Sequence, residues 1–498
     1  MDFHFKCPNT KCNQELKAEL KSAGRRCSCP SCRTDFRIPQ PPKASAPPPP
    51  PAGSSGGRPA SSRNFTCPVC WERFNSGEMM HIAAHDSLRG DAVLGKDAQQ
   101  RFFATRFNNA GQALDAMGLA AFDIACPHCR RKLPLGFLDI KHHIISLVGD
   151  QSAGKSYFLA VMMKVFPGLI FQKYGVIFAD SDPAANAPLN SMRNALFTAE
   201  TASQAKLAKT VFEGEMYERL PRQGRMVALP KPFVYTLTPS DKSQKHALIF
   251  YDNAGEHFQP GVNIVEQPGA QHVASAAGII FLFDPLNSPE FRIAITDNLD
   301  RPMGHHISLP DSQNFSTMPT IVPPMWHDIS LPNSQNINDL PAQFERPIVD
   351  QQDIILAEMR VRIQAIRNLR PDETPNTPVA FVVGKCDTWL QLLNATPLRD
   401  ESATEWNSKV IRKLLISLCP AVVANAELLS SNIMYFATSS FGHTPVKIGP
   451  GEYAPDPKQL KPIQVETPLL WILSQVAPSL LSGTGPRDSE KNNSSRKK

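Results

Sequence analysis

The sequence has no long apolar run, and its first residues do not show the pattern of a secretory leader. In its 498 residues, no apolar run reaches the roughly 18 residues that a membrane helix needs. The longest run lies near Ile279–Phe283. The first residues, MDFHFKCPNT, have no apolar core preceded by basic residues, so we expect no secretory signal. These absences favour a cytoplasmic protein.

A dense run of lysine and arginine is also missing, although the formal net charge is +6. Residues 1–63 carry 11 Lys+Arg against 4 Asp+Glu, and residues 487–498 carry 5 against 2. The positive charge therefore lies at the two ends, where charge commonly serves solubility. Nucleic-acid binding has only slight support from the basic N-terminal part.

The spacing of the cysteines indicates metal sites. Eight of the 11 cysteines fall in four close pairs, and without a secretory signal such pairs favour zinc over disulfides. Four thiolates bind zinc tetrahedrally and leave no open position for catalysis, so we expect two structural Zn²⁺ sites. The expected ligands are Cys7, Cys12, Cys29 and Cys32 for the first site, and Cys67, Cys70, Cys126 and Cys129 for the second.

Each zinc site has an alternative ligand set. In the first site, Cys27 is left over or replaces one ligand. In the second, a finger-like set would combine the first two cysteines with His81 and His85, across a gap of ten residues instead of about twelve. That set leaves Cys126 and Cys129 without a role, so we prefer four cysteines.

Composition divides the chain into segments. Residues 39–62 are too rich in proline and glycine to bury a core. From His142 onward, strand-like and helical runs alternate, which is typical of an α/β domain. Residues 303–345 hold the near-repeat ISLPDSQN and ISLPNSQN, which predicts an irregular insertion. The expected order is a zinc ribbon at 1–38, a disordered linker at 39–62, a second zinc-binding module at 63–137, the α/β domain at 138–480 and a disordered tail at 481–498.

The α/β domain has recognisable strands and helices. Helices are predicted after Asp350, over Trp406–Leu418 and from Thr467. The predicted strands are His143–Val148, Phe233–Thr238, Ala247–Tyr251, Gly278–Asp284, Val379–Val383 and Asn432–Ala437.

The segment GDQSAGKS matches the phosphate-binding pattern G-x-x-x-x-G-K-S. A buried strand is predicted to end at Val148, and the loop after it would surround phosphates with backbone N–H groups. Lys155 would reach the terminal phosphates, and the Ser156 hydroxyl would bind Mg²⁺. The helix that follows directs its positive dipole end at the anion. The expected nucleotide-binding residues are Gly149, Asp150, Gln151, Ser152, Ala153, Gly154, Lys155 and Ser156.

A second segment, FYDNAGEHF, follows about 100 residues later. A strand delivers Asp252, which in P-loop enzymes supports Mg²⁺ at such a strand end. The backbone N–H of Gly255 could donate to the γ-phosphate, which would make this segment a nucleotide-dependent switch.

Two further segments concern the base. In GTPases, the [N/T]-K-x-D aspartate accepts two hydrogen bonds from guanine, and here VGKCD supplies Lys385 and Asp387 after a strand. Gly384 replaces the usual Asn or Thr and loses a side chain that ties this loop to the P-loop. The segment ATSS supplies Thr438 and Ser439, where GTPases place backbone contacts to the base.

Together these segments resemble the TRAFAC class of GTPases, and more narrowly the double-GTPase families of bacterial conflict systems. The resemblance is carried by GDQSAGKS, FYDNAGEHF, FLFDP, VGKCD and ATSS, with CPVCWERF…CPHCRRKLP as the accompanying zinc module, over roughly residues 63–480. It implies a P-loop NTPase α/β fold, with a mostly parallel sheet flanked by helices and preceded by the second zinc module. It also implies a GTP-binding and GTP-hydrolysing switch between unknown protein partners, using GTP/GDP, Mg²⁺ and Zn²⁺. The segment with Cys7, Cys12, Cys29 and Cys32 separately resembles small zinc ribbons, which gives two zinc-ribbon modules in front of the α/β domain.

The catalytic assignment departs from the family pattern. We assign catalysis to Lys155 and Glu256, although many GTPases have Gln where this chain has Glu256. His257 is the other candidate for positioning the attacking water. The switch threonine is not assigned among Thr198, Thr201 and Thr210. A zinc-ribbon adaptor that binds nucleotide but hydrolyses it poorly is therefore the alternative function.

Overall fold

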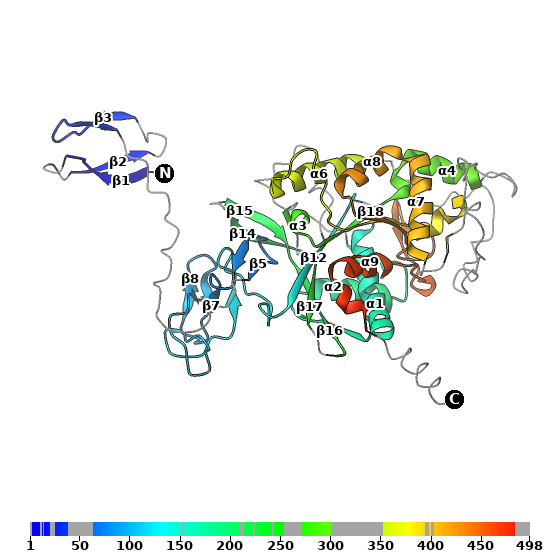
Figure 1. Cartoon of the computed structure of the whole chain (residues 1–498), viewed down its shortest axis with the longest axis horizontal. Coiled ribbons are helices and arrows are strands. Elements are labelled where there is room, and N and C mark those ends of the chain that lie inside the picture. The colour runs from blue at the N-terminus through cyan, green and yellow to red at the C-terminus, as the bar shows by residue number, and fades with distance from the viewer. Residues whose placement is uncertain are drawn as a thin grey trace. The chain divides into compact units, whose positions relative to one another are not determined.

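The structure is a computed structural model, and it divides the chain into two compact units, Met1–Ser61 and Ser62–Lys498 (Figure 1). The predicted linker, the predicted insertion and most of the predicted tail lie outside the described residues. The described residues are 2–9, 12, 14–19, 25–37, 63–151, 153–208, 214, 216–222, 225–241, 244–252, 271–299, 352–393, 398–399 and 403–483.

The first unit contains two short antiparallel hairpins. Their loops bring the four cysteines of the first predicted zinc site together. The hairpins are β1 (Asp2–Lys6) with β2 (Glu15–Glu19), and β3 (Arg26–Ser28) with β4 (Asp35–Arg37).

The second cysteine-rich module, residues 63–137, is also built from short antiparallel strands. It consists of two hairpins and a three-stranded sheet in which β7 is central. Its strands are β5 (Asn64–Thr66), β6 (Arg73–Asn75), β7 (Met80–Ile82), β8 (Arg89–Asp91), β9 (Gly95–Gln99), β10 (Arg101–Phe102) and β11 (Ile124–Ala125).

A seven-stranded sheet forms the centre of the second unit, in the order β13-β16-β17-β12-β18-β19-β20. The β17, β12, β18, β19 and β20 strands pair in parallel, so their carboxyl ends meet at one edge. The β13–β16 and β16–β17 pairs are antiparallel. The strands are β12 (Lys141–Gly149), β13 (Val176–Asp180), β16 (Phe233–Pro239), β17 (His246–Tyr251), β18 (Gly278–Phe283), β19 (Val379–Val383) and β20 (Ile433–Ala437).

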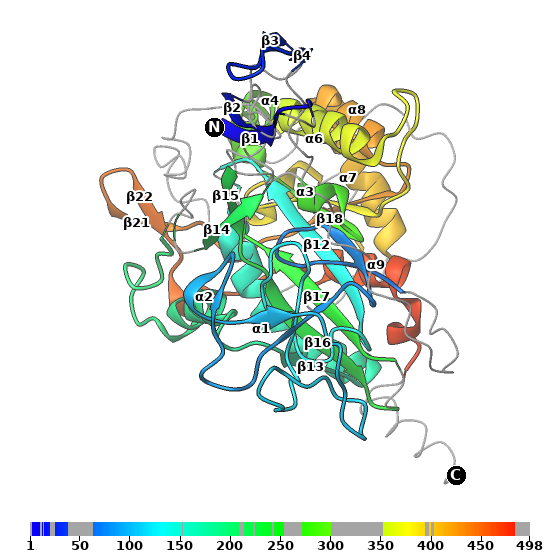
Figure 2. The ribbon, with the colours of Figure 1, turned by 90° about the vertical axis from the view of Figure 1, so that its left-hand side faces the viewer.

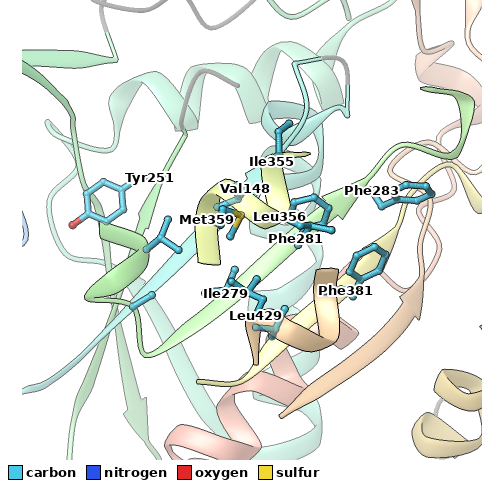
Figure 3. Packing of buried hydrophobic residues seen from close by; sticks show 14 of the residues in the cluster. Val148, Tyr251, Ile279, Phe281, Phe283, Ile355, Leu356, Met359, Phe381 and Leu429 are labelled. Carbon is cyan, nitrogen blue, oxygen red and sulfur yellow. The ribbon is translucent and has the colours of Figure 1, made fainter. Parts of the chain in front are cut away.

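Helices cover both faces of this sheet (Figure 2). One face packs against α1 (Lys155–Tyr174), α2 (Ala187–Thr198) and α9 (Thr467–Val476). The other packs against α3 (Gln271–Ala274), α4 (Pro289–Leu299), α6 (Gln352–Arg367), α7 (Thr404–Leu418) and α8 (Pro420–Leu429). Figure 3 shows Val148 and Phe281 of the sheet beside Leu356 and Met359 of α6.

The mixed α/β fold with a mostly parallel sheet agrees with the prediction from the sequence. Each predicted strand is present within two residues of its expected bounds. The sequence missed β13 and two hairpins, which are β14 (Tyr217–Arg222) with β15 (Arg225–Pro230) and β21 (Val446–Gly449) with β22 (Glu452–Ala454). None of the helices in the described part of the chain has the length and apolarity that a bilayer crossing requires.

Candidate functional site

The phosphate-loop segment connects the end of β12 to the start of α1. Gly149 ends the strand, and a side chain there would collide with the backbone carbonyl of Leu282 on β18. Gly154 has a φ of 82°, in the left-handed region that favours glycine, and α1 begins at the next residue. Both glycines thus permit the backbone path that the sequence pattern predicts.

The lysine of this loop is buried and faces the loop backbone. Lys155 Nζ donates to the carbonyl oxygens of Gly149 at 3.0 Å and Asp150 at 2.7 Å. Its ammonium group therefore lies inside the turn that is predicted to surround phosphates. The backbone N–H of Ala153 also donates to the Asp150 carbonyl, at 3.2 Å. Gln151 is exposed, and Ser152 lies outside the described residues.

The two predicted Mg²⁺ ligands meet although they are 96 residues apart in the sequence. Ser156 is on the first turn of α1, and the buried Asp252 follows β17. The Ser156 hydroxyl donates to Asp252 Oδ2 at 2.7 Å. Hydroxyl and carboxylate oxygens are the ligands that Mg²⁺ prefers, so this pair fits the ion.

The predicted base-recognition loop follows β19 and is tied to the loop after β20. The backbone N–H of Cys386 donates to the Thr438 carbonyl at 2.9 Å, and that of Thr438 donates to the Val383 carbonyl at 3.1 Å. Burial raises the pKa of Asp387, and a hydrogen bond from the Ser439 side chain opposes that rise. Further N–H donors would stabilise the charge of this half-buried carboxylate.

Lys385 has a left-handed φ of 53°, and its ammonium group is paired with an acidic residue at the end of the neighbouring strand. Its Nζ lies 2.6 Å from Asp284 Oδ2, at the end of β18. The sequence identified Lys385 but not its acidic partner.

Part of the predicted switch and catalytic segment is not described by the structure. Gly255, Glu256 and His257 lie outside the described residues, as does Thr210. Thr198 is exposed at the end of α2, where its hydroxyl donates to the Asn194 carbonyl at 2.8 Å.

The first predicted zinc site is a compact group of sulfur atoms, which we call the first four-cysteine cluster. The Sγ atoms of its four predicted ligands, Cys7, Cys12, Cys29 and Cys32, lie within 4.8 Å of one another. Sulfur pairs approach to 3.7 Å and 3.8 Å. Cys27 lies on β3 and is not in this cluster.

The second predicted site is likewise a compact group, the second four-cysteine cluster. It consists of four buried cysteines, Cys67, Cys70, Cys126 and Cys129, which are its predicted ligands. The Cys67–Cys129 and Cys70–Cys126 sulfur pairs are each 3.8 Å apart. His81 and His85 are not among them, so the geometry does not support the finger-like alternative.

The spacing of the sulfur atoms fits a zinc ion in both clusters. Four tetrahedral ligands at about 2.3 Å from zinc place their sulfur atoms roughly 3.8 Å apart. In the second cluster, the backbone N–H groups of Val69 and His128 each point at a cysteine sulfur, at 3.4 Å. The four thiols also share protons. Hydrogen bonding with Cys129 lowers the pKa of Cys126 and raises that of Cys129.

The second four-cysteine cluster belongs to the same hydrophobic core as the sheet. Trp71, next to Cys70, packs edge-on against Tyr251 at 5.7 Å between ring centroids. The Tyr251 hydroxyl donates to the Pro68 carbonyl at 2.5 Å. Tyr251 is the residue directly before Asp252, so the cluster supports the strand that delivers a predicted Mg²⁺ ligand.

Comparisons with known proteins give limited support. No family model matches the chain. It is 26% identical over 199 residues to a Mycolicibacterium smegmatis protein, provisionally named ESX-1 scaffolding and assembly protein SaeC. That match covers 38% of this chain and 44% of SaeC, so the chain spans less than half the length of this relative.

A comparison with solved structures matches a Plasmodium falciparum protein, provisionally named nucleolar GTP-binding protein 1. The identity is 11% and the TM-score is 0.22, over 73% of this chain and 100% of that one. A TM-score this low supports no conclusion about fold or function.

Proposed function

We propose that the chain binds guanine nucleotide with Mg²⁺ at the carboxyl edge of the sheet and hydrolyses GTP slowly, as a molecular switch. The observation that supports this is the meeting of three elements at one edge. Lys155 lies after β12, the Ser156–Asp252 pair joins α1 to β17, and Asp387 lies after β19. Ligands of open α/β sheets bind outside the carboxyl ends of the strands.

Each element has a chemical role in this proposal. Lys155 would exchange its bonds to loop carbonyls for bonds to phosphate oxygens. Ser156 would bind Mg²⁺ directly, with Asp252 supporting the ion. Asp387 would accept two hydrogen bonds from guanine, which would offset the cost of its burial. Glu256 would position water, and a carboxylate in place of an amide there is the reason to expect slow turnover.

The two four-cysteine clusters are proposed to hold one structural Zn²⁺ each. Their sulfur spacing fits the ion, and none of the 11 cysteines forms a disulfide. Cysteines without disulfides are typical of a reducing compartment, which supports the cytoplasm as the place of action. Metal analysis of anaerobically purified protein should find two zinc ions per chain; fewer than one would refute this assignment.

Nucleotide titration of the Lys155→Ala variant tests the phosphate site. This change removes the predicted cation from the loop and should abolish binding of GTP and GDP. Lys164→Ala is the matched control, because Lys164 is an exposed lysine on the same helix. Equal affinity of both variants for GTP would contradict the proposed site.

A nucleotide-binding scaffold is the second candidate function. The observation that favours it is the match to a relative named for scaffolding and assembly. In this case the chain would bind unknown protein partners and barely turn nucleotide over, and the assignment to bacterial signalling or conflict would rest on resemblance alone. Single-turnover hydrolysis separates the candidates, since a switch must convert bound GTP to GDP and a scaffold need not.

A further inference from the structure

The loop after β18 contacts both nucleotide-binding loops at once. β18 lies between β12 and β19 in the sheet, so its carboxyl end separates the P-loop from the loop that carries Asp387. Asn287 Nδ2 donates to Asp150 Oδ2 of the P-loop at 2.5 Å. On the other side, Asp284 Oδ2 accepts from Lys385 Nζ at 2.6 Å. One short segment thus links the predicted phosphate and base sites.

Hydrogen bonds within the loop and from α6 fix the conformation of this loop. Asp284 is 2% exposed, and its carboxylate accepts the backbone N–H of Leu286 at 3.0 Å. The Gln352 amide, at the start of α6, bonds both backbone groups of Asp284. It accepts from the N–H at 2.7 Å and donates to the carbonyl at 3.0 Å. Asn287, 7% exposed, follows in the same turn. Because these anchors fix the turn, its side chains reach their partners from defined positions.

The loop after β19 has no side chain at Gly384 with which to make such a link. Gly384 is attached to β18 through its backbone N–H, which donates to the Phe283 carbonyl at 2.9 Å. Its own carbonyl accepts from Trp389 Nε1 at 2.9 Å. Lys385 therefore makes the side-chain link to β18, and Asn287 continues it to the P-loop.

We propose that Asp284 and Asn287 are positioning residues that set the distance between the P-loop and the guanine-recognition loop. This inference rests on the proposed function. A ligand that spans both loops binds best when their spacing is already fixed, because ordering the loops then costs no binding free energy. A ligand that contacts only the P-loop does not depend on that spacing.

The test measures GDP and inorganic tripolyphosphate binding by Asn287→Ala and the wild type. Loss of one hydrogen bond to a charged acceptor corresponds to about a tenfold effect. Asn287→Ala should therefore bind GDP about tenfold more weakly and release it faster. Tripolyphosphate, which spans only the phosphate loop, should compete with unchanged affinity.

A double-mutant cycle that exchanges the Asn and Asp side chains distinguishes positioning from general loss of structure. Asn287→Asp places two carboxylates against each other and should weaken GDP binding more than Asn287→Ala does. Adding Asp150→Asn exchanges donor and acceptor, so the double variant should regain GDP affinity.

Three results would overturn the inference. If Asn287→Ala bound GDP as tightly as the wild type does, the positioning role would be overturned and the proposed function would stand. Equal weakening of GDP and tripolyphosphate would mean that Asn287 only shapes the P-loop. Absence of GDP binding by the wild type would instead overturn the proposed function, and the positioning role with it.

Discussion

Replacing Tyr251 with phenylalanine removes one hydroxyl between the second four-cysteine cluster and the sheet. The ring is fully buried, and burial raises the pKa of Tyr251 well above its usual value, so the group is a neutral donor. The change keeps the ring contacts with Trp71 and His272 and deletes the hydrogen bond to the Pro68 carbonyl.

The expected cost follows from the carbonyl that is left behind. A buried polar group that loses its partner costs about 1–3 kcal/mol. Because Pro68 lies between two predicted zinc ligands, Cys67 and Cys70, we expect this loss to loosen the second cluster rather than the sheet as a whole. About 1.4 kcal/mol corresponds to a tenfold change in an equilibrium constant, so zinc release should accelerate by about tenfold.

The assay follows zinc release to a chromogenic chelator in a Cys29→Ser background, so that only the second cluster retains zinc. Tyr435→Phe is the matched control. Tyr435 lies on the edge strand β20 and belongs to the same hydrophobic cluster, and its hydroxyl donates to Glu427 Oε1 of α8 at 3.1 Å. The control should lower stability without changing zinc release. Equal release rates for Tyr251→Phe, Tyr435→Phe and the unaltered background would refute the reasoning.

The remaining predictions concern folding, pH and base recognition. Cys126→Ser should lower the thermal unfolding midpoint of the sheet-containing unit, because its sulfur lies in the sheet's core, whereas Cys29→Ser should not; circular dichroism melts compare the two. Burial lowers the pKa of His143 to about 4 and that of its hydrogen-bond partner His246 below 6.5. The unfolded chain therefore binds more protons below pH 6.5. The free energy of unfolding, measured by urea melts, should stay constant above pH 6.5 and fall from there toward pH 4, with His143 contributing up to about 1.4 kcal/mol per pH unit. Asp387→Asn should weaken GDP binding at least about tenfold by calorimetry, since it removes the charged acceptor of two hydrogen bonds; unchanged affinity would exclude Asp387 from base recognition.

The sequence predicts the strands well where they are buried on both faces. The β18 and β19 strands are continuous apolar runs, GIIFLF and VAFVV, as expected for central parallel strands. The β13 strand is a short edge strand with exposed residues, so its pattern gives little signal. Cysteine spacing also predicts which sulfur atoms meet, because the two cysteines of each close pair lie on the same tight turn.

Contacts between distant residues could not be predicted in this way. The Asn287–Asp150 pair is 137 residues apart, and the Tyr251–Pro68 pair is 183 apart. Both depend on strand order and on which face a module covers. Periodicity reports which residues are buried, but it does not report what they are buried against. For the same reason, the pairing of Lys385 with Asp284 emerges only from the folded sheet.

Titration of the full chain with labelled GTP and ATP in the presence of Mg²⁺ tests the central claim most directly. Adenine does not offer the two donors that Asp387 is proposed to bind, so GTP should bind at least about tenfold more tightly than ATP. Binding of both should be lost when Mg²⁺ is removed by a chelator. Equal affinity for GTP and ATP would contradict guanine recognition and leave a general P-loop nucleotide site.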